Sequence, residues 1–218
     1  MKELSKESLG SAIYDRISQE LVRGKLRPNQ KVTIRGLAEA LGTSSTPVRD
    51  AVQRLLQDDA LEQRSMRDVR VPVPALAQYA EIASIRAELE GLAAARAAEM
   101  ATDKQIAALR RLVERNEEAM RAQRWSAAAE LNQQFHFALA EIAQMPVMLT
   151  ILHRLWLRMG PLIAGYYGSA RISPVQRHHT IVAACEARDA DAARAAMRAD
   201  ISDGKEGITA YIKSFEPG

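Results

Sequence analysis

Two prolines separated by one residue, in the stretch Val71-Pro72-Val73-Pro74, divide this chain of 218 residues into two unequal parts. Proline lacks a backbone N–H and disfavours helical geometry in the residue before it, so no helix can run through this stretch. Before it, helical patterns alternate with short strand-like segments. After it, helical patterns dominate from about residue 76 to about residue 212. We therefore expect a mainly α-helical protein with two domains, 1–74 and 75–218.

The composition is that of a globular protein, with 47% hydrophobic and 26% charged residues. No apolar run approaches the roughly 18–20 residues that cross a bilayer, and the charged N-terminus does not resemble a signal peptide. The single cysteine, Cys185, cannot form an internal disulfide, which favours a reducing compartment. These features predict a cytoplasmic protein with no membrane association.

The positive charge is concentrated in the first domain. Residues 1–75 contain 13 lysines and arginines against 10 aspartates and glutamates, so they carry the whole net charge of +3. The remaining residues are neutral overall. A basic bias in a small domain is compatible with a polyanionic partner, although many solvated surfaces are equally basic.

The pattern of the first domain predicts three helices followed by a β-hairpin. We expect helices over residues 7–23 and 34–41, with a third that begins after Ser44 or Ser45 and has Pro47 in its first turn. Thr33 is positioned to cap the second helix, which ends at Gly42. Two alternating segments, 61–64 and 69–73, then predict the hairpin. This order is typical of a winged helix-turn-helix, whose third helix enters the major groove of DNA.

Polar and basic side chains lie where such a domain meets DNA. Hydroxyls and an arginine occupy the start of the third helix, an arginine begins the second helix, and the hairpin carries three more. Each residue alone is more often an ordinary surface group, and Ser44 can act simply as a cap, so the combination supports the assignment. The candidate DNA contacts are Arg35, Ser44, Ser45, Thr46, Arg49 and Arg67, with Arg64 and Arg70 beside the last of these.

Residues 37–52, with the sequence LAEALGTSSTPVRDAV, resemble the DNA-binding signature of the GntR family of bacterial transcriptional regulators. Gly24-Lys25-Leu26-Arg27-Pro28 is similar to a second element of that family. Two positions depart from the pattern: the family commonly has arginine where Ser45 stands and glycine where Asn29 stands. The resemblance implies a dimer that binds a pseudo-palindromic operator in double-stranded DNA.

The pattern of the second domain predicts about six amphipathic helices packed into an all-α antiparallel bundle. We expect them over residues 76–100, 103–123 and 126–144, from Pro146 to Gly160-Pro161, and over 174–187 and 190–212, with an uncertain segment after Pro161. This region resembles the FCD ligand-binding domain of FadR-type GntR regulators. The resemblance is carried by residues 85–90, by Phe135-His136 and by residues 178–189.

Helical spacing places several polar residues on the buried faces of these helices. Asn132 and His136 are four residues apart and share a face. His178 falls on the apolar stripe of its helix, whereas His179 is rotated away by about 100°. Asp200 falls among the small apolar residues of the last helix. Because a buried carboxylate needs a partner, two imidazoles near Asp200 indicate either a divalent metal site or a metal-free network with a protonated histidine or Arg86.

The FCD resemblance implies a metal at this place, held in many members by an aspartate and three histidines. Carried over by position, the ligands are Asn132, His136, His178 and Asp200. Asn132 replaces a carboxylate and Asp200 replaces a histidine, so the number of charges is preserved. The ion expected is one divalent transition metal, such as Zn, Ni, Mn or Fe.

Arg86 is a candidate for pairing with the carboxylate of a small organic-acid effector, and its alternative is a surface or interhelical salt bridge with Glu90. The leading hypothesis is thus a ligand-responsive transcriptional regulator, most simply a repressor. One alternative is a regulator for which the metal itself is the signal. Another is a metal-dependent enzyme with a DNA-binding module, which is disfavoured because the sequence contains no GxSxG, P-loop or HExxH motif.

Overall fold

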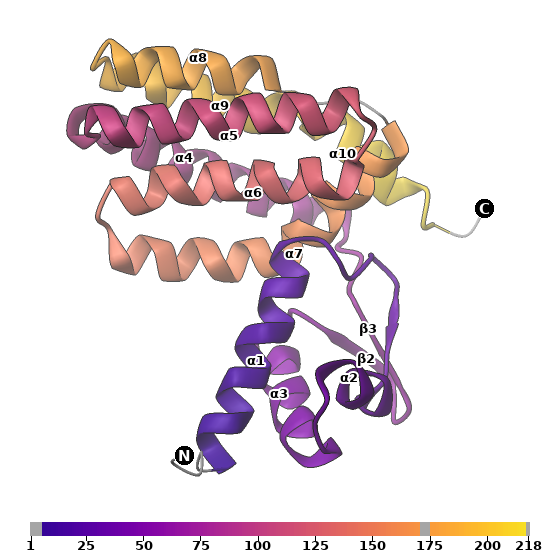
Figure 1. The fold of residues 1–218 in the computed structure, drawn as a ribbon. Helices are drawn as coiled ribbons and strands as arrows, with labels where there is room; N and C mark the ends of the chain where they lie inside the picture. Colours follow the sequence, from indigo (N-terminus) through magenta and orange to yellow (C-terminus); the bar gives the residue numbers. More distant parts are fainter. Residues whose placement is uncertain (1–5, 171–174, 217–218) are drawn as a thin grey trace.

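The structure is a computed structural model that describes residues 6–170 and 175–216. It is mainly α-helical and has two parts, a small domain with a three-stranded sheet and a larger helical bundle (Figure 1). The elements of the first part are α1 (Lys6–Val22), β1 (Lys31–Val32), α2 (Ile34–Leu41), α3 (Ser45–Gln57), β2 (Glu62–Ser65) and β3 (Asp68–Arg70). This order confirms the expected winged helix-turn-helix.

The turn between α2 and α3 is set by local sequence. The Thr33 hydroxyl oxygen accepts a hydrogen bond from the Gly36 N–H at 3.0 Å and caps α2. Gly42 then adopts a left-handed φ of 63°, which favours glycine, and ends α2. Ser44 occupies the N-cap position of α3 without a capping hydrogen bond from its side chain. Its hydroxyl therefore remains exposed at the start of this helix.

The sheet has one strand that the sequence did not predict. The strand order is β1-β3-β2, with both neighbours antiparallel. The strand β1 is only two residues long, Lys31 and Val32, and pairs with Arg70 and Val69. Two residues are too few to show an alternation of apolar and polar side chains. Pairing with β3, and not the local sequence pattern, therefore makes this segment a strand.

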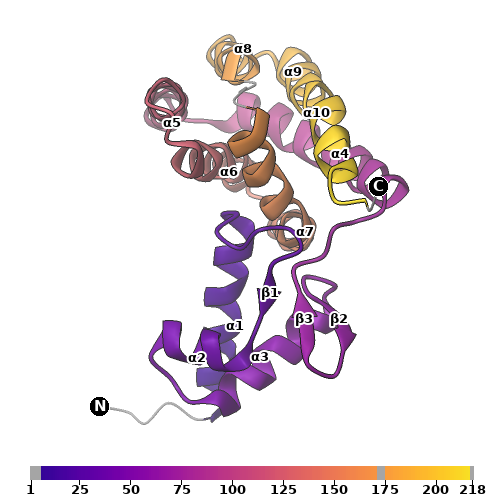
Figure 2. The same ribbon diagram turned by 90° about the vertical axis from the view of Figure 1, so that its right-hand side faces the viewer.

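The bundle contains α4 (Leu76–Met100), α5 (Asp103–Arg121), α6 (Trp125–Ile142), α7 (Pro146–Ala170), α8 (Val175–Glu186), α9 (Ala190–Asp203) and α10 (Lys205–Lys213). Figure 2 shows α7 at the side of the bundle that faces the first domain, while α8 and α9 lie on the far side. Helix α9 packs along α4, and α5 packs between α6 and α8.

Two helix boundaries differ from those expected. Helix α7 does not end at Gly160-Pro161 but continues to Ala170. Proline removes one helical hydrogen bond, but the buried side chains on both sides of it, Trp156, Leu157, Leu162 and Ile163, hold the helix together by tertiary packing. The expected helix 190–212 is interrupted at Gly204 and forms α9 and α10. The expected start of α8 at Pro174 lies outside the described residues.

The two parts meet where the C-terminal end of α1 crosses α7. A Cβ atom built at Gly160 would clash with the backbone carbonyl oxygens of Leu21 and Val22, and one at Gly24 would clash with Ala164. The backbones of α1 and α7 therefore touch, and one hydrophobic core runs from α1 into α7. Side-chain ion pairs flank this contact, including Arg23–Glu130 at 3.4 Å.

One helix of the described chain, α7, is long and apolar enough to cross a membrane when judged by length and composition alone. Half of that segment is buried inside the protein. Helices at the centre of a globular core meet the same criterion, and α7 contacts α1, α4, α6 and α10.

Candidate functional site

A cluster of three buried side chains lies inside the bundle. His136 comes from α6, His178 from α8 and Asp200 from α9, and one nitrogen or oxygen atom of each lies within 4.8 Å of the others. His136 Nε2 lies 3.4 Å from Asp200 Oδ2, and His178 Nε2 lies 3.4 Å from Asp200 Oδ1. We refer to these residues as the His-Asp cluster. Three helices thus bring together residues that are separated by up to 64 positions in the sequence.

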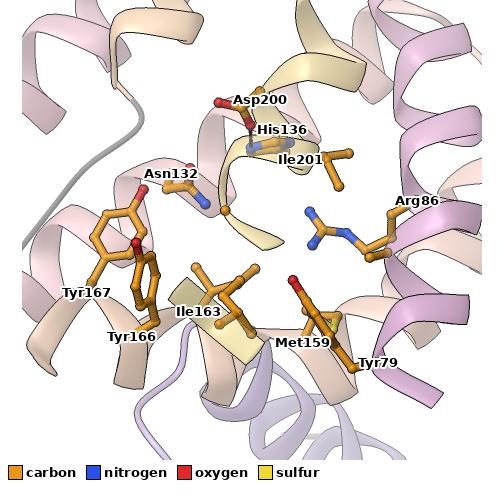
Figure 3. Close-up of a pocket in the computed structure, with 13 residues that line it drawn as sticks. Tyr79, Arg86, Asn132, His136, Met159, Ile163, Tyr166, Tyr167, Asp200 and Ile201 are labelled. Carbon is orange, nitrogen blue, oxygen red and sulfur yellow. Dashed lines mark ion pairs between the residues drawn. The ribbon is translucent and has the colours of Figure 1, made fainter. Parts of the chain in front are cut away.

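The helical phases expected from the sequence are confirmed at this cluster. Asn132, His136, His178 and Asp200 are all buried, with exposed fractions of 5% or less. His179, by contrast, is half-buried and turned away from the cluster, with its Nε2 2.8 Å from an oxygen of Glu117 on α5. Asn132 shares the α6 face of His136 and lies beside it in Figure 3.

Glu90 on α4 is part of the same network, a role that its sequence position did not reveal. One carboxylate oxygen of Glu90 lies 2.5 Å from His136 Nδ1. The other accepts hydrogen bonds from Arg86 Nε at 2.6 Å and from Trp156 Nε1 at 3.1 Å. A carboxylate on the far nitrogen of a histidine orients the ring and fixes its tautomer, as the partners of metal-bound histidines do. The i,i+4 spacing to Arg86 was the only sequence signal for Glu90.

The charges of the network shift its proton equilibria. Burial alone would raise the pKa of Glu90, but the charges of Arg86 and His136 and their hydrogen bonds lower it to about 2. Burial alone would lower the pKa of His136, but the charge of Glu90 and the hydrogen bonds of Asp200 and Glu90 raise it to about 9. Without an ion, the network is therefore a balanced set of two cations and two carboxylates.

His178 behaves differently from His136. Burial is the main cause that lowers its pKa to about 4, although the charge of Asp200 opposes this shift. Its ring stacks on Phe135 with centroids 4.3 Å apart. Among the described residues, neither nitrogen of His178 nor Oδ1 of Asp200 has a hydrogen-bond partner. Such buried orphan atoms are rare in folded proteins, and a bound ion is one of the groups that satisfies them.

These orphan atoms support the metal interpretation of the cluster. A neutral imidazole, an anionic carboxylate and a nearby amide form a donor set that first-row transition metals accept. The metal-free network expected as the alternative also has a partner for Asp200, but that partner is His136 and not Arg86. Arg86 pairs with Glu90 instead, the partner that its alternative assignment named, but this pair is buried and lies within α4 and not at the surface or between helices.

A pocket that is partly open to solvent adjoins the cluster, and its cavity volume is about 40 Å³. Figure 3 shows His136 and Asp200 on one side of this space, Arg86 on another and aromatic rings on a third. Polar groups of Asn132, His136, Asp200 and Arg86 thus converge on one cavity. The other lining residues come mainly from α4, α7 and α9–α10: Tyr79, Ala83, Met159, Ile163, Tyr166, Tyr167, Ile201, Gly204 and Ile208.

Arg86 is both paired and accessible to the cavity. Its guanidinium is 4.3 Å from the centroid of the Trp156 ring, over whose face it lies. Its side chain lines the pocket while its Nε bonds Glu90. Figure 3 shows the terminal nitrogens of the guanidinium directed toward the cavity. Tyr79, which was not among the residues expected at this site, lies seven residues before Arg86 on the same helical face.

Helix α7 is a shared wall between this pocket and the first domain. Met159 and Ile163 line the pocket, whereas their immediate neighbours Gly160 and Ala164 contact the C-terminal end of α1 and Gly24 just after it. A displacement of this turn of α7 therefore changes both the wall of the pocket and the contact with the first domain. Adjacent residues on a helix point in directions about 100° apart. The sequence therefore shows that they lie on different faces of α7, but not which neighbours those faces contact.

The candidate DNA contacts lie on the surface of the first domain. Arg67 is exposed, and Arg35, also exposed, pairs with Glu39 at 2.8 Å. The remaining candidates, Ser44, Ser45, Thr46 and Arg49, are exposed in the first turn of α3 or directly before it.

The other two hairpin arginines have intramolecular partners. Arg70 is half-buried and bonds both Asp68 and the backbone carbonyl of Asn29, so it braces the hairpin. Arg64 pairs with Glu62 at 2.6 Å. The structure thus brings together the α3 candidates, whereas Arg70 is half-buried and engaged within the hairpin.

The sequence matches two known domains in this order. Residues 9–71 match the gntR family of bacterial regulatory proteins, and residues 81–203 match the FCD domain. The chain is 31% identical to the HTH-type transcriptional regulator McbR of Escherichia coli (strain K12) over 191 residues, which are 86% of each chain. It is 23% identical to the HTH-type transcriptional repressor RspR of the same organism over 206 residues, 93% of this chain and 90% of that one.

Solved structures agree with these matches. The structure of E. coli McbR/YncC superposes with a TM-score of 0.84 at 29% identity, covering 94% of this chain and 98% of that one. The matched domains and relatives are transcription regulators and not enzymes. The chain is therefore a transcriptional regulator that belongs to the GntR family and combines its DNA-binding domain with an FCD domain.

Proposed function

We propose that this protein is a metal-dependent, metabolite-responsive repressor whose DNA affinity is set by the occupancy of the pocket beside the His-Asp cluster. One observation carries the proposal: α7 forms a wall of the pocket and also packs, backbone to backbone, against α1 of the DNA-binding domain. Other GntR relatives include proteins described as repressors, which supports this direction of regulation. The protein acts where DNA is, in the bacterial cytoplasm.

In this proposal the first domain binds operator DNA through α3 and the hairpin. The exposed hydroxyls of Ser44, Ser45 and Thr46 at the start of α3 suit phosphate oxygens, because backbone N–H groups there already favour an anion. Arg49, exposed in the first turn, has the length and the fork geometry to read a guanine. Serine at position 45 is shorter than the arginine common in the family, so the preferred operator differs at the base that this position faces.

His136, His178 and Asp200 would hold a divalent transition metal, with Asn132 as a neutral fourth donor. The buried orphan atoms of His178 and Asp200 support this assignment. When bound, the ion supplies a positive centre at the edge of the pocket that accepts an anionic oxygen of a ligand. Glu90 holds the His136 ring from behind, which keeps Nε2 directed at Asp200.

The ligand class follows from the charges around the cavity. Glu90 accepts the hydrogen bond of Arg86 Nε, and the terminal guanidinium nitrogens of Arg86 are directed toward the cavity (Figure 3). A carboxylate binds such a guanidinium with two parallel hydrogen bonds. Tyr79, Tyr166 and Tyr167 add rings and hydroxyls, so a small organic acid with further polar groups fits the lining.

Signal transfer runs through α7. A ligand that presses on Met159 and Ile163 displaces the turn that also carries Gly160 and Ala164. Because α1 and α7 are in backbone contact, no side chain between them can absorb the shift. The orientation of α1, and with it that of α3, changes relative to the bundle. In a homodimer on a pseudo-palindromic operator, such a change alters the spacing of the two recognition helices.

The test measures DNA binding by fluorescence anisotropy. The probe is a duplex that the wild-type protein selects from a random library in vitro. Binding is compared for protein stripped with EDTA, for protein reloaded with Zn²⁺, Mn²⁺, Ni²⁺ or Fe²⁺, and for reloaded protein with a panel of small carboxylic acids. We expect at least one acid to weaken DNA binding only when the metal is present.

Two outcomes separate this proposal from its alternatives. If free metal changes DNA binding across its titration and no acid adds to the effect, the protein is a metal sensor. If acids act equally on stripped protein, the cluster is a metal-free network. The His178→Ala variant should lose the acid response, whereas His179→Ala, changed at the neighbouring outward position, should keep it.

A further inference from the structure

The tip of the β2–β3 hairpin carries Met66, which is 94% exposed. It is the most exposed of the large hydrophobic residues in the described chain, and the next, Val147, is 76% exposed. Around Met66 the exposed neighbours are polar or charged: Arg64, Ser65 and Arg67. Met66 is therefore an isolated apolar side chain on a polar hairpin and not the edge of an apolar patch.

The tip is not built from residues that favour a tight turn. Ser65 pairs with Asp68, so Met66 and Arg67 form a two-residue loop. Such loops usually contain glycine, asparagine or aspartate at positive φ. Neither Met66 nor Arg67 has a positive φ, and the ladder is irregular between Gln63 and Ser65. Departures from local preference of this kind concentrate at functional positions.

The charges beside Met66 are arranged asymmetrically. Arg64 and Arg70, on the two strands, are paired with Glu62 and Asp68. Arg67 is different: within the part of the chain that the structure describes, no acidic group forms an ion pair with it. The tip thus presents one unpaired cation next to one apolar side chain.

We infer that Met66 is an apolar wedge that enters the minor groove of the operator and partly unstacks one base step, with Arg67 held against the adjacent phosphates or groove edge. This inference rests on the proposed DNA-binding function of the first domain. The minor groove attracts arginine by its negative potential, and proteins that bend DNA insert methionine and other apolar side chains between base pairs there. A single long, unbranched side chain beside a cation matches this groove, which is only about 6 Å wide.

If Met66 acts as a wedge, the protein should prefer some base steps over others at a position where it makes no hydrogen bond to a base. Pyrimidine–purine steps such as TA and CA unstack most readily, so the protein should prefer one of them where the hairpin meets the DNA. A protein partner is a weaker candidate occupant of this tip. Protein interfaces have a buried apolar centre, and the exposed polar neighbours of Met66 provide none.

The test uses the full-length protein and the duplex that wild type selects from a random library. The variants are Met66→Ala and Met66→Gln, with Met66→Leu as the control that keeps an apolar side chain of similar size. The adenine analogue 2-aminopurine is placed at successive steps of the duplex, because its fluorescence increases when it is unstacked. Because Met66 is exposed, all three variants should have the melting temperature of wild type.

For wild type and Met66→Leu we expect increased 2-aminopurine fluorescence at one step near the end of each half-site. Met66→Ala and Met66→Gln should lose this signal and bind about tenfold more weakly, as expected when a buried apolar side chain is lost. A pool reselected with Met66→Ala should show no base preference at that step.

Three results would overturn the inference. One is unchanged affinity and fluorescence in Met66→Ala and Met66→Gln. The second is an equal loss of affinity in Met66→Leu, which would indicate a shape-specific contact other than a wedge. The third is a change in oligomeric state of the variants without DNA, which would assign Met66 to a protein interface. If wild type itself selects no duplex, the proposed function fails, and that result is separate from all three.

Discussion

Oε2 of Glu90 lies 2.5 Å from Nδ1 of His136, and this contact joins α4 to the helix that carries half of the candidate metal ligands. The same carboxylate group accepts the Nε hydrogen bond of Arg86. Glu90 is thus the point at which the candidate effector contact and the His-Asp cluster are connected. A ligand that moves Arg86 acts through Glu90 on the orientation of His136.

Glu90→Gln should destabilise the protein strongly. The change removes one charge from a buried group and leaves Arg86 and His136 without their carboxylate. Breaking a buried ion pair in this way costs about 3–5 kcal/mol. Urea unfolding of metal-free protein measures the loss. The matched control is Glu88→Gln on the same helix, because the ion pair of Glu88 with Arg198 is exposed and should contribute no more than about 1 kcal/mol. Equal effects of both changes would show that burial does not decide the contribution of Glu90.

The metal assignment is tested by comparing two adjacent histidines. His178→Ala should abolish metal retention, because His178 faces the cluster and its ring nitrogens lack other partners among the described residues. His179→Ala should retain the metal, because His179 is turned away from the cluster and bonds Glu117 on α5. Elemental analysis of protein purified without a polyhistidine tag, after supplementation with metals, gives the answer. Wild type that carries no transition metal under these conditions would favour the metal-free network.

The inward positions of the cluster were predictable, whereas its connections were not. Helical periodicity separates His178 from His179 and places Asp200 among buried residues, because each helix buries one continuous face. The contact between Glu90 and His136 joins residues 46 positions apart on different helices. No periodicity within one helix carries that information. Pocket residues in the later part of α7, such as Ile163 and Tyr166, were likewise hidden by a wrong boundary at Pro161.

The fold was predictable where local chemistry decides it. The capping residue Thr33, the left-handed Gly42 and the break at Pro72 and Pro74 each fix a boundary independently of the rest of the protein. Long-range packing decided the features that were missed. The two residues of β1 become a strand only by pairing with β3, and α7 passes through Pro161 only because buried side chains on both sides hold it.

Arg49→Ala should weaken binding to the selected duplex by about 1–3 kcal/mol if Arg49 contacts a guanine with both terminal nitrogens. The fold should be unaffected, because the side chain is exposed at the start of α3. Anisotropy titration at fixed salt measures the change. Arg96→Ala is the control: it removes an exposed arginine of the bundle that pairs only with Glu99 on its own helix. A loss of affinity as large in Arg96→Ala would point to overall charge and not to a base contact.

The contact between α1 and α7 is tested by two glycines of α7. Gly160→Ala forces a methyl group against the carbonyls of Leu21 and Val22, which are backbone atoms that cannot rotate away. Overpacking of this kind destabilises by about 1–3 kcal/mol. Gly168→Ala places the same methyl group where, among the described residues, no atom outside the helix's own backbone lies within 4 Å. It should be neutral or should stabilise the helix by up to about 1 kcal/mol. Thermal unfolding distinguishes the two, and equal behaviour would contradict the backbone contact.

If Gly160→Ala folds, its DNA affinity should no longer respond to the acid that acts on wild type, because the shift of α1 is already imposed. Gly168→Ala should respond normally. A normal response in Gly160→Ala would mean that the signal reaches the DNA-binding domain by a route other than this turn of α7.

The stability of the metal-free protein should fall as the pH rises from neutral to above 9. Burial opposes protonation of His136, but the carboxylates of Glu90 and Asp200 raise its pKa from 6.5 to about 9 in the folded protein. A raised pKa means that the folded state binds the proton more tightly than the unfolded chain. The stabilisation is therefore complete below pH 6.5, decreases between 6.5 and 9, and is lost above 9.

His136→Gln should be less stable at neutral pH, but its free energy of unfolding should change less over this interval. Urea unfolding at several pH values in EDTA measures both slopes, with His179→Gln as the control that should follow wild type. Parallel slopes for wild type and His136→Gln would show that His136 is not the group that titrates.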